Sequence, residues 1–367
     1  QLQSDYNGQF KWGGRRHDLL AGVDVFKERA KRNNNFSGGS TNLTTTVGTP
    51  NDGDRRADER GAPEMNHFDS QTLGLYLQDT VHLSPEWKLV GGVRVDQFKA
   101  DYRDVDGFTK SIDDVLTSPR VGLLYQPSEH ASYYASWGTS FNTSADTYQF
   151  ALGSLAEGSN NEKLANTPPE KSRNLEIGAK WDVFDNRALL GVAVFRSEKF
   201  NERNTDADSA ASQYLLSGKR HATGMEFNLA GRFTPKWEIF WNHTWIPEAK
   251  IDISNVSSGN AQQQGDRPGL TPKHSGSIWS TYRFSPQWRA GLGLNYRSEQ
   301  SPEGNRNVTA KAYTTADAML EYGWTEATTI KANVSNLTNA LYAEELYRGF
   351  YKPGAARKLE VSLKHLF

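Results

Sequence analysis

The sequence predicts an all-β protein, a transmembrane antiparallel β-barrel of the outer membrane of a Gram-negative bacterium. The first observation is the pattern of residues 358–367, in which Leu359 and Val361 fall on one face and Lys358 and Glu360 on the other. Such a strand finds lipid on one side and water on the other, with every backbone group paired, only in a closed barrel. For this segment alone, the alternative interpretation as an amphipathic edge strand of a soluble β-sandwich remains open.

The second observation is the composition of the chain, which has 367 residues with 32 Gly, 15 Tyr, 17 Phe and 10 Trp. Aromatic residues of this abundance are typical of the girdles at the two membrane interfaces of a barrel. No run of eighteen apolar residues occurs, which excludes a helical membrane protein. There is no cysteine, and a net charge of -1 gives no general attraction to nucleic acid.

The third observation is a series of hairpins along the chain. The alternating segments predict fifteen strands, at about residues 2–12, 18–30, 67–83, 87–101, 116–126, 130–139, 172–182, 188–199, 214–233, 237–247, 273–284, 288–298, 312–322, 327–336 and 357–367. Their connections alternate between short turns and long loops, the longest at 31–66 and 140–171. This alternation is typical of outer-membrane barrels, which have short periplasmic turns and long extracellular loops.

Three of the short turns share the pattern Ser/Thr-Pro-x-Trp, at residues 84–87, 234–237 and 285–288. Proline fixes the first corner of a turn, and the tryptophan that opens the next strand can lie at a membrane interface. We therefore expect these turns on the periplasmic side and a structural role for their tryptophans. In the adjoining strands the polar series should face the lumen; it includes Arg94, Asp96, Arg289, Arg297, Asp317 and Glu321.

The number of strands predicts that more of the barrel precedes Gln1. Single-chain bacterial barrels have even numbers of strands, because both termini lie on the periplasmic side. Fifteen is an odd number and the last strand ends at the C-terminus, so we expect the first strands of the barrel to lie upstream of Gln1.

Four stretches resemble one family: residues 168–181 (PPEKSRNLEIGAKW), 215–240, 265–284 and 334–367. In this order they are similar to TonB-dependent siderophore receptors, above all to the catecholate siderophore receptors. The resemblance implies a barrel of twenty-two strands filled by an N-terminal plug domain. Residues 1–367 would then be the C-terminal part of this barrel, with about fifteen of the twenty-two strands, and with the plug and the first strands missing.

The resemblance implies TonB-dependent uptake of a ferric siderophore, not an enzyme activity. The iron arrives chelated by the siderophore, so neither a cofactor nor a metal site of the protein is expected, and the eight histidines are scattered. The implied partners are the ferric siderophore, the TonB complex through the plug, and lipopolysaccharide with the outer-membrane lipid. We expect a monomer and no nucleic acid.

Candidate binding residues are aromatic rings and guanidinium groups near the loop end of the barrel, because these together suit a flat polyanion. They are Trp137, Phe141, Tyr214, Arg220, Arg297, Tyr347, Arg348 and Tyr351. The last loop also contains Tyr342 and Phe350. The opposing interpretation is that rings at this height form an outer girdle and that each arginine is solvated.

Other functions remain open at this point. A passive porin would share the fold, and a receptor of the same family could carry a hydroxamate siderophore or another cargo. An outer-membrane enzyme would need a Ser/His or Asp/His constellation at the outer rim, and no such motif is found in the sequence.

Overall fold

The computed structural model describes residues 1–33, 65–103, 105, 107, 109–142, 169–203, 215–254, 259–347 and 349–367. Within these ranges the regular elements are all strands. They are β1 (Leu2–Trp12), β2 (Arg15–Asn33), β3 (Met65–His82), β4 (Trp87–Arg103), β5 (Thr109–Ser128), β6 (Ala131–Asn142), β7 (Glu170–Val183), β8 (Ala188–Arg203), β9 (Leu215–Thr234), β10 (Trp237–Ile253), β11 (His274–Arg283), β12 (Trp288–Arg297), β13 (Tyr313–Gly323), β14 (Thr328–Ser335), β15 (Ala343–Leu346), β16 (Tyr351–Pro353) and β17 (Lys358–His365). No helix in the described part of the chain has the length and apolarity needed to cross a membrane.

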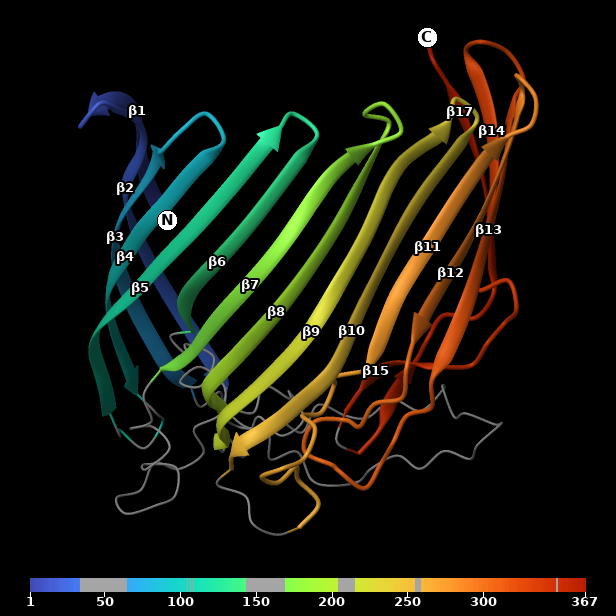
Figure 1. Ribbon diagram of the computed structural model, residues 1–367. Helices are drawn as coiled ribbons and strands as arrows, with labels where there is room; N and C mark the ends of the chain where they lie inside the picture. Colours follow the sequence, from blue (N-terminus) through green and yellow to red (C-terminus); the bar gives the residue numbers. More distant parts are fainter. Residues whose placement is uncertain are drawn as a thin grey trace.

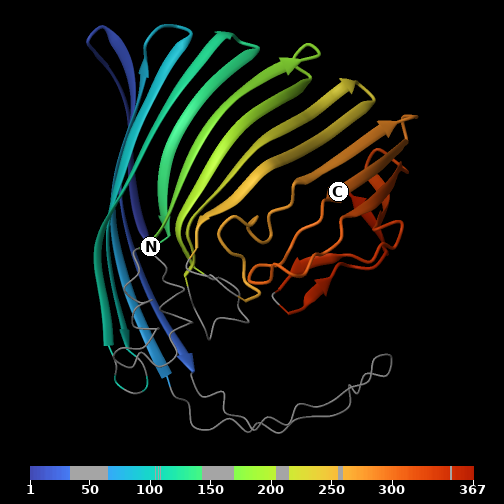
Figure 2. The ribbon, with the colours of Figure 1, turned by 60° about the horizontal axis from the view of Figure 1, so that its bottom comes forward.

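Fifteen of these strands form one antiparallel sheet, in the order β1 to β14 followed by β17. The sheet curves into a wall around a hollow, with β1 and β17 as its two edges (Figures 1 and 2). The remaining strands, β15 and β16, pair with each other as a small hairpin at the other end from the chain's C-terminus. The expected fifteen antiparallel strands are confirmed; the small hairpin was not expected.

The seven short turns lie together at one end of the wall, at the top of Figure 1, and we call this the short-turn end. The opposite end carries the long connections and is called the loop end. One of the two-residue turns is Gly13-Gly14, where both residues have positive φ, at 59° and 76°. Two successive residues of this kind form the type I′ turn that matches the twist of a hairpin.

The Ser/Thr-Pro-x-Trp turns are closed by their first side chain. The hydroxyl of Ser84 accepts hydrogen bonds from the backbone amides of Glu86 and Trp87 at 3.3 and 3.1 Å. Ser285 accepts one from Trp288 at 3.0 Å, and Thr234 accepts one from Lys236 at 3.3 Å. The pattern read from the sequence is therefore a self-contained turn with its own hydrogen-bond acceptor.

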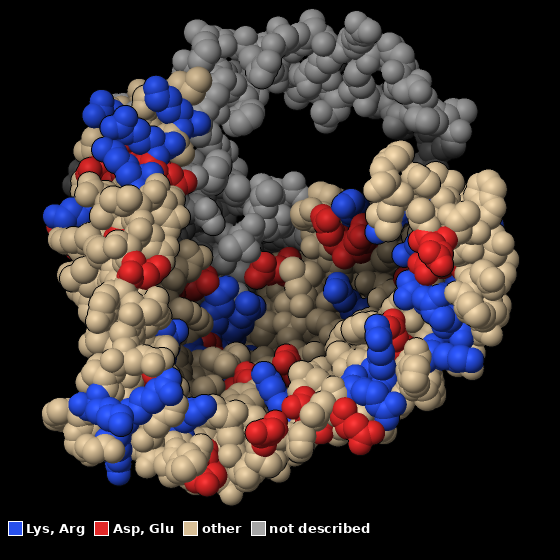
Figure 3. Space-filling model, turned by 90° about the horizontal axis from the view of Figure 1, so that it is seen from above, with Lys and Arg blue, Asp and Glu red and all other residues tan. Residues whose placement is uncertain are grey.

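The two faces of the wall differ in polarity, because successive side chains of a strand alternate between them. Figure 3 shows charged side chains of both signs inside the hollow, on the concave face. The strand registers place all six expected lumen residues on this one face: Arg94, Asp96, Arg289, Arg297, Asp317 and Glu321. The convex face is apolar and exposed, with Ile177 60% and Leu292 54% accessible.

An aromatic row crosses the convex face at the short-turn end. Trp87 stacks on Tyr125 at 4.4 Å between ring centroids, and Trp288 lies 4.5 Å from Tyr322. The row continues through Tyr133, Trp181 and Trp237. The tryptophans that open the strands after the Pro turns therefore lie on the outward apolar face, as predicted.

Near the loop end the wall splits between β5 and β6. Their pairing stops at Arg120 and Gly138, and the next residue of β5 is Pro119, which has no amide hydrogen to donate. Beyond this point Phe141 packs against the buried cluster Phe68, Phe98, Ala100, Tyr102 and Leu116, which lies on the concave face of β3–β5. The end of β6 thus packs against the inner side of β5.

Candidate functional site

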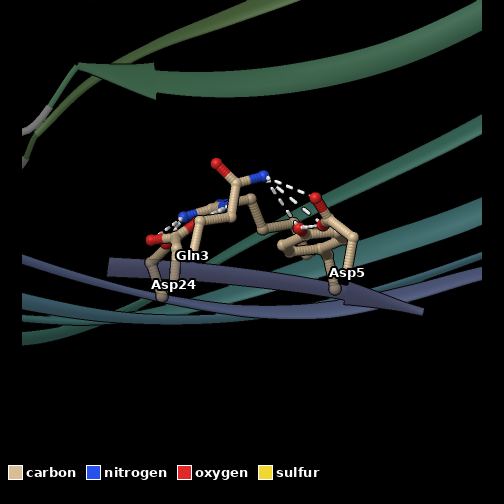
Figure 4. A network of polar contacts seen from close by, with 6 residues as sticks. Gln3, Asp5 and Asp24 are labelled. Carbon is tan, nitrogen blue, oxygen red and sulfur yellow. Dashed lines mark hydrogen bonds and ion pairs between the residues drawn. The ribbon is translucent and has the colours of Figure 1, made fainter. Parts of the chain in front are cut away.

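Six polar side chains on the concave face of β1–β4 form one network (Figure 4). They are Gln3, Asp5, Asp24, Tyr76, Arg94 and Asp96. Arg94 donates hydrogen bonds to Asp24 at 2.6 Å and to Asp96 at 2.5 Å, and the hydroxyl of Tyr76 donates to Asp5. A cavity of about 780 Å³ lies over the network. The cavity is lined by three carboxylates, of Asp5, Asp24 and Asp96, and by two guanidinium groups, of Arg94 and Arg120, so this part of the hollow is unfavourable for an anion.

A second cavity, of about 440 Å³, lies at the loop end between the loop that follows β12 and the loop that contains β15 and β16. We call it the aromatic pocket; Tyr313, Tyr342, Tyr347, Phe350 and Tyr351 are among the residues that line it. Tyr313 stacks on Tyr342 at 4.5 Å, and Tyr347 stacks on Phe350 at 4.6 Å. The first pair joins the start of β13 to the last loop, and the second pair lies within that loop. Both pairs present flat apolar surfaces to a ligand.

The last loop is anchored by Asn336, which is 4% exposed and has a φ of 48°. Its amide nitrogen donates to the carbonyls of Ala340 and Ala355 at 2.9 and 3.0 Å, and its side-chain oxygen accepts from the amide of Ala340 at 2.8 Å. Its backbone amide donates to Asp317 of β13 at 2.8 Å. One asparagine therefore joins both ends of the loop to the wall.

Gly354 makes room for the pocket. A Cβ built on this residue would lie 2.0 Å from the ring of Tyr342, so the ring occupies the space of the missing side chain. The amide of Gly354 also donates to the carbonyl of Tyr342 at 2.9 Å. The glycine thereby positions Tyr342 against Tyr313.

The opposing loop is held by Gln262, which is 6% exposed. Its side chain donates to the carbonyl of Pro302 and accepts from the amide of Gly304, both at 2.8 Å. Because Pro302 lines the aromatic pocket, the connection between β10 and β11 supports the pocket from outside.

Electrostatic contacts order the hairpin at the rim. Glu345 accepts hydrogen bonds from the hydroxyl of Tyr347 at 2.7 Å and from Lys352 at 2.9 Å. These two partners, Tyr347 first, hold the pKa of the Glu345 carboxyl below its usual value. Burial, followed by the charge of Glu344, raises the pKa of the Tyr342 phenol.

The structure brings four of the candidate residues to the inner side of the wall or to the pocket. Tyr347 and Tyr351 line the aromatic pocket. Arg297 ends β12 on the concave face, directly opposite Tyr313 of the pocket. Arg220 lies on the concave face of β9, opposite Lys199.

The other candidates lie elsewhere. Trp137 shares the convex face with Val121 and Leu175, its direct partners on β5 and β7, so it faces away from the hollow. Phe141 is packed against the cluster at the wall split, with the ammonium of Lys171 5.4 Å from its ring centre. Tyr214 and Arg348 lie outside the described residues.

Sequence reasoning missed Tyr313 and Asn336. Tyr313 could have been found from the pairing of two consecutive strands, because it lies opposite Arg297. Asn336 carried no usable signal, since its bonds to Asp317 and Ala355 each reach across nineteen residues. Within the described ranges, no three His, Cys, Asp or Glu side chains come close enough together to hold a metal ion.

Comparisons with known proteins agree on one family. A family model described as TonB dependent receptor-like, beta-barrel, matches residues 1–337. The chain is 32% identical over 338 residues to a probable TonB-dependent receptor, BfrD, of Bordetella pertussis, a match that covers 86% of this chain and 44% of that protein. It is 27% identical over 317 residues to the catecholate siderophore receptor Fiu of Escherichia coli K12, covering 78% of this chain and 40% of Fiu.

Solved structures share the fold. The closed form of the ferric-catecholate import receptor Fiu superposes with a TM-score of 0.79 at 23% identity, over 99% of this chain and 54% of that one. The siderophore receptor PiuA of Acinetobacter baumannii gives a TM-score of 0.78 at 23% identity, over 98% and 54%. The chain thus spans less than half the length of the curated relatives it matches and about half of these structures.

Proposed function

Because the chain belongs to the family of TonB-dependent receptors, we propose that it forms part of an outer-membrane receptor that takes up a ferric siderophore of the catecholate type. Its relatives are transport receptors, not enzymes. In this proposal residues 1–367 form the C-terminal part of the barrel of a longer protein, which also supplies a plug and works as a monomer. The plug would receive the energy for transport from the TonB complex.

The observation that carries the cargo class is the aromatic pocket with Arg297 opposite Tyr313. A ferric catecholate is flat-faced and polyanionic, so stacked rings and guanidinium groups complement it. The acidic network around Arg94 lies away from this pocket on β1–β4 and would repel the same ligand. Capture at the loop end is therefore favoured over capture at the network. The siderophore itself would hold the iron, so the protein needs no cofactor.

The test uses the full-length receptor with Arg220→Ala and Arg297→Ala combined. A charge-assisted hydrogen bond contributes about 1.5 to 3 kcal/mol, so losing two should raise the Kd for a ferric catecholate more than tenfold. The matched control is Arg187→Ala with Arg232→Ala, two exposed arginines at the short-turn end. Unchanged affinity in the first variant, with normal folding, would refute the proposed site.

Growth under iron limitation separates the alternatives. Deleting the full gene should abolish growth on the ferric catecholate and leave growth on a ferric hydroxamate intact. The reverse pattern would favour a hydroxamate receptor. Uptake that persists in cells lacking TonB would favour a passive porin.

Labelling of whole cells tests the orientation of the wall. A cysteine at Val308, in the loop after β12, should react with an impermeant reagent, whereas one at Ser285, in a short turn, should not. Reaction at Ser285 alone would reverse the proposed topology.

A further inference from the structure

The last part of β10 departs from regular pairing with its neighbour β9 where the two strands approach the loop end (Figure 1). The register shifts over residues 245–248 and again over residues 251–253, and in the second shift Asp252 is the extra residue of β10. Such bulges change the direction of side chains and are frequent beside functional sites. His221 of β9 lies between the two shifts, directly opposite Lys250.

The ring of His221 lies between two carboxylates. The side chain is only 5% exposed, and its Nδ1 lies 2.8 Å from Asp252. Its Nε2 is buried and lies 3.3 Å from Glu248, but it makes no hydrogen bond within the described part of the chain. A neutral imidazole has a single N–H and can donate to one carboxylate, whereas an imidazolium has two and can donate to both. The geometry therefore provides a second partner that only the protonated ring can use.

The neighbouring strands add charges of both signs around this ring. On β8 the residue opposite His221 is Glu198. Its carboxylate lies within 3.7 Å of three cations, Arg173, Arg196 and Lys219. On β10 the opposite residue is Lys250, which is exposed, so that water screens its charge. Among the described residues, proton uptake by His221 therefore acts mainly on Glu248 and Asp252.

Ile251 connects this part of β10 to the loop that follows the strand. Ile251 is 4% exposed, and its amide donates a hydrogen bond to the carbonyl of Asp266 at 2.9 Å. Its carbonyl accepts one from the amide of Gly265, also at 2.9 Å. Because Ile251 directly precedes Asp252, a displacement of Asp252 also displaces these two backbone bonds.

The same loop supports the aromatic pocket. Asp266 accepts a hydrogen bond from Arg306 of the opposing loop at 2.8 Å, and Gln262 donates one to the carbonyl of Pro302 at 2.8 Å. Pro302 lines the pocket. A continuous set of hydrogen bonds therefore leads from His221 through residues 251–266 to one side of the pocket.

We propose that His221 is a positioning residue of the aromatic pocket and that it acts only when its ring is protonated. The imidazolium holds both carboxylates, which fixes the end of β10 and, through Ile251, the loop that supports Pro302. Loss of the proton releases Glu248 and leaves this side of the pocket less ordered. The β15–β16 side is anchored separately, by Asn336. Proton uptake and capture of the ferric catecholate then strengthen each other, because both favour the ordered loop. This inference rests on the proposed function, in which the pocket is the capture site.

The experiment measures the Kd of the full-length receptor in nanodiscs for a ferric catecholate at about pH 5.5 and about pH 8, on either side of the range in which imidazoles ordinarily titrate. His221→Gln cannot take up a proton, and Glu248→Gln removes the partner that only the imidazolium attracts. Glu248 is 60% exposed, so its substitution should leave the fold intact. The matched control is His82→Gln, because His82 also lies beside a carboxylate, that of Asp18 at 2.5 Å, but at the short-turn end.

Protonation of the catecholate itself changes the Kd of every variant alike. The informative quantity is therefore the Kd of a variant divided by that of the unmodified receptor at the same pH. For His221→Gln and Glu248→Gln this ratio should be close to one at the higher pH and about fivefold or more at the lower pH, which is the lower end of coupling between sites in proteins. A ratio that is the same at both pH values for either variant, or one that changes with pH for His82→Gln, would overturn the proposal.

Hydrogen exchange separates this inference from the proposed function. The protection factor of the Gly265 amide corrects for the intrinsic pH dependence of exchange. It should be higher at the lower pH in the unmodified receptor and equal at both pH values in Glu248→Gln. If no siderophore binds at either pH but the protection behaves in this way, the proposed function fails and the positioning role of His221 stands. If the siderophore binds and neither the Kd ratio nor the protection depends on pH, the proposed function stands and this inference fails.

Discussion

The two ends of the wall are stabilised in different ways. At the short-turn end each turn is closed by residues next to one another in the chain, as in Gly13-Gly14 and in the Ser84 turn. At the loop end the aromatic pocket depends on contacts between distant segments, such as Asn336 with Ala355 and Gln262 with Gly304. Local signals therefore suffice to place the strands, whereas the binding surface exists only once the whole sheet has formed.

The largest effect is expected for Asn336→Ala at the loop end. Three buried side-chain hydrogen bonds are lost, so local opening of residues 336–357 should become easier by about 2 to 4 kcal/mol. Hydrogen exchange of the Gly354 amide in the full-length receptor measures this change. Asn242→Ala, which removes one exposed bond to Ser277, is the control. Equal protection in both variants would mean that Asn336 is not the anchor.

Gly354→Val should displace Tyr342 and narrow the pocket. Forcing a side chain into a filled space costs about 1 to 3 kcal/mol. We expect faster exchange across β15 and β16 and weaker binding of the ferric catecholate. Gly91→Val is the matched control, because a Cβ there meets no atom within 4 Å and the residue lies on β4, away from the aromatic pocket. Identical affinities for the two variants would contradict the role given to Gly354.

At the short-turn end Ser84→Ala should have a smaller effect, about 1 kcal/mol, because it leaves two amides without their acceptor. The loss should stay local, with unchanged siderophore binding. Ser84→Thr keeps the hydroxyl and should restore stability in urea unfolding. A change in siderophore affinity in the Ala variant would show that the two ends are not independent.

The smallest effect is expected from acidification. The Glu345 carboxyl has a lowered pKa in the folded hairpin, so its contribution to stability is complete above the usual value of 4.5 and is lost as the pH falls through the folded value. Exchange protection of the hairpin should thus be constant from pH 7 to about 5 and decline below it. Glu345→Gln should remove this decline; a decline that persists must come from another group.

The sequence predicted the strands well where lipid imposes alternation, and less well beyond it. β1 has the expected bounds, but β5 begins at Thr109 where 116 was expected, and β10 ends at Ile253 where 247 was expected. Outside the apolar band both faces of a strand meet water, so apolar and polar residues no longer alternate and the end of the strand is not marked in the sequence. The β15–β16 hairpin was missed because its first strand, Ala343–Leu346, is short and polar.

The candidate binding residues show that residue type alone does not decide whether a side chain faces the pocket or the outside of the wall. Tyr347 and Tyr351 line the pocket, whereas Trp137 faces outward. Its segment contains Tyr133 and Tyr134 side by side, so alternation alone did not say which parity faces lipid. The pairing of Trp137 with Val121 decides it, and that information lies in another strand.

The split at Pro119 divides the wall into two parts, which we call panels and which are joined by backbone hydrogen bonds near the short-turn end. β1–β5 form one panel, and β6–β14 with β17 form the other. Between the two panels the backbone ladder runs only from the short-turn end to Arg120 and Gly138. Beyond Arg120 and Gly138 the two panels contact each other through side chains, with Phe141 packed against the cluster on β3–β5. A side-chain contact can slide where a ladder of hydrogen bonds cannot. We therefore expect shear at this seam to move the loop end of the wall more than the short-turn end.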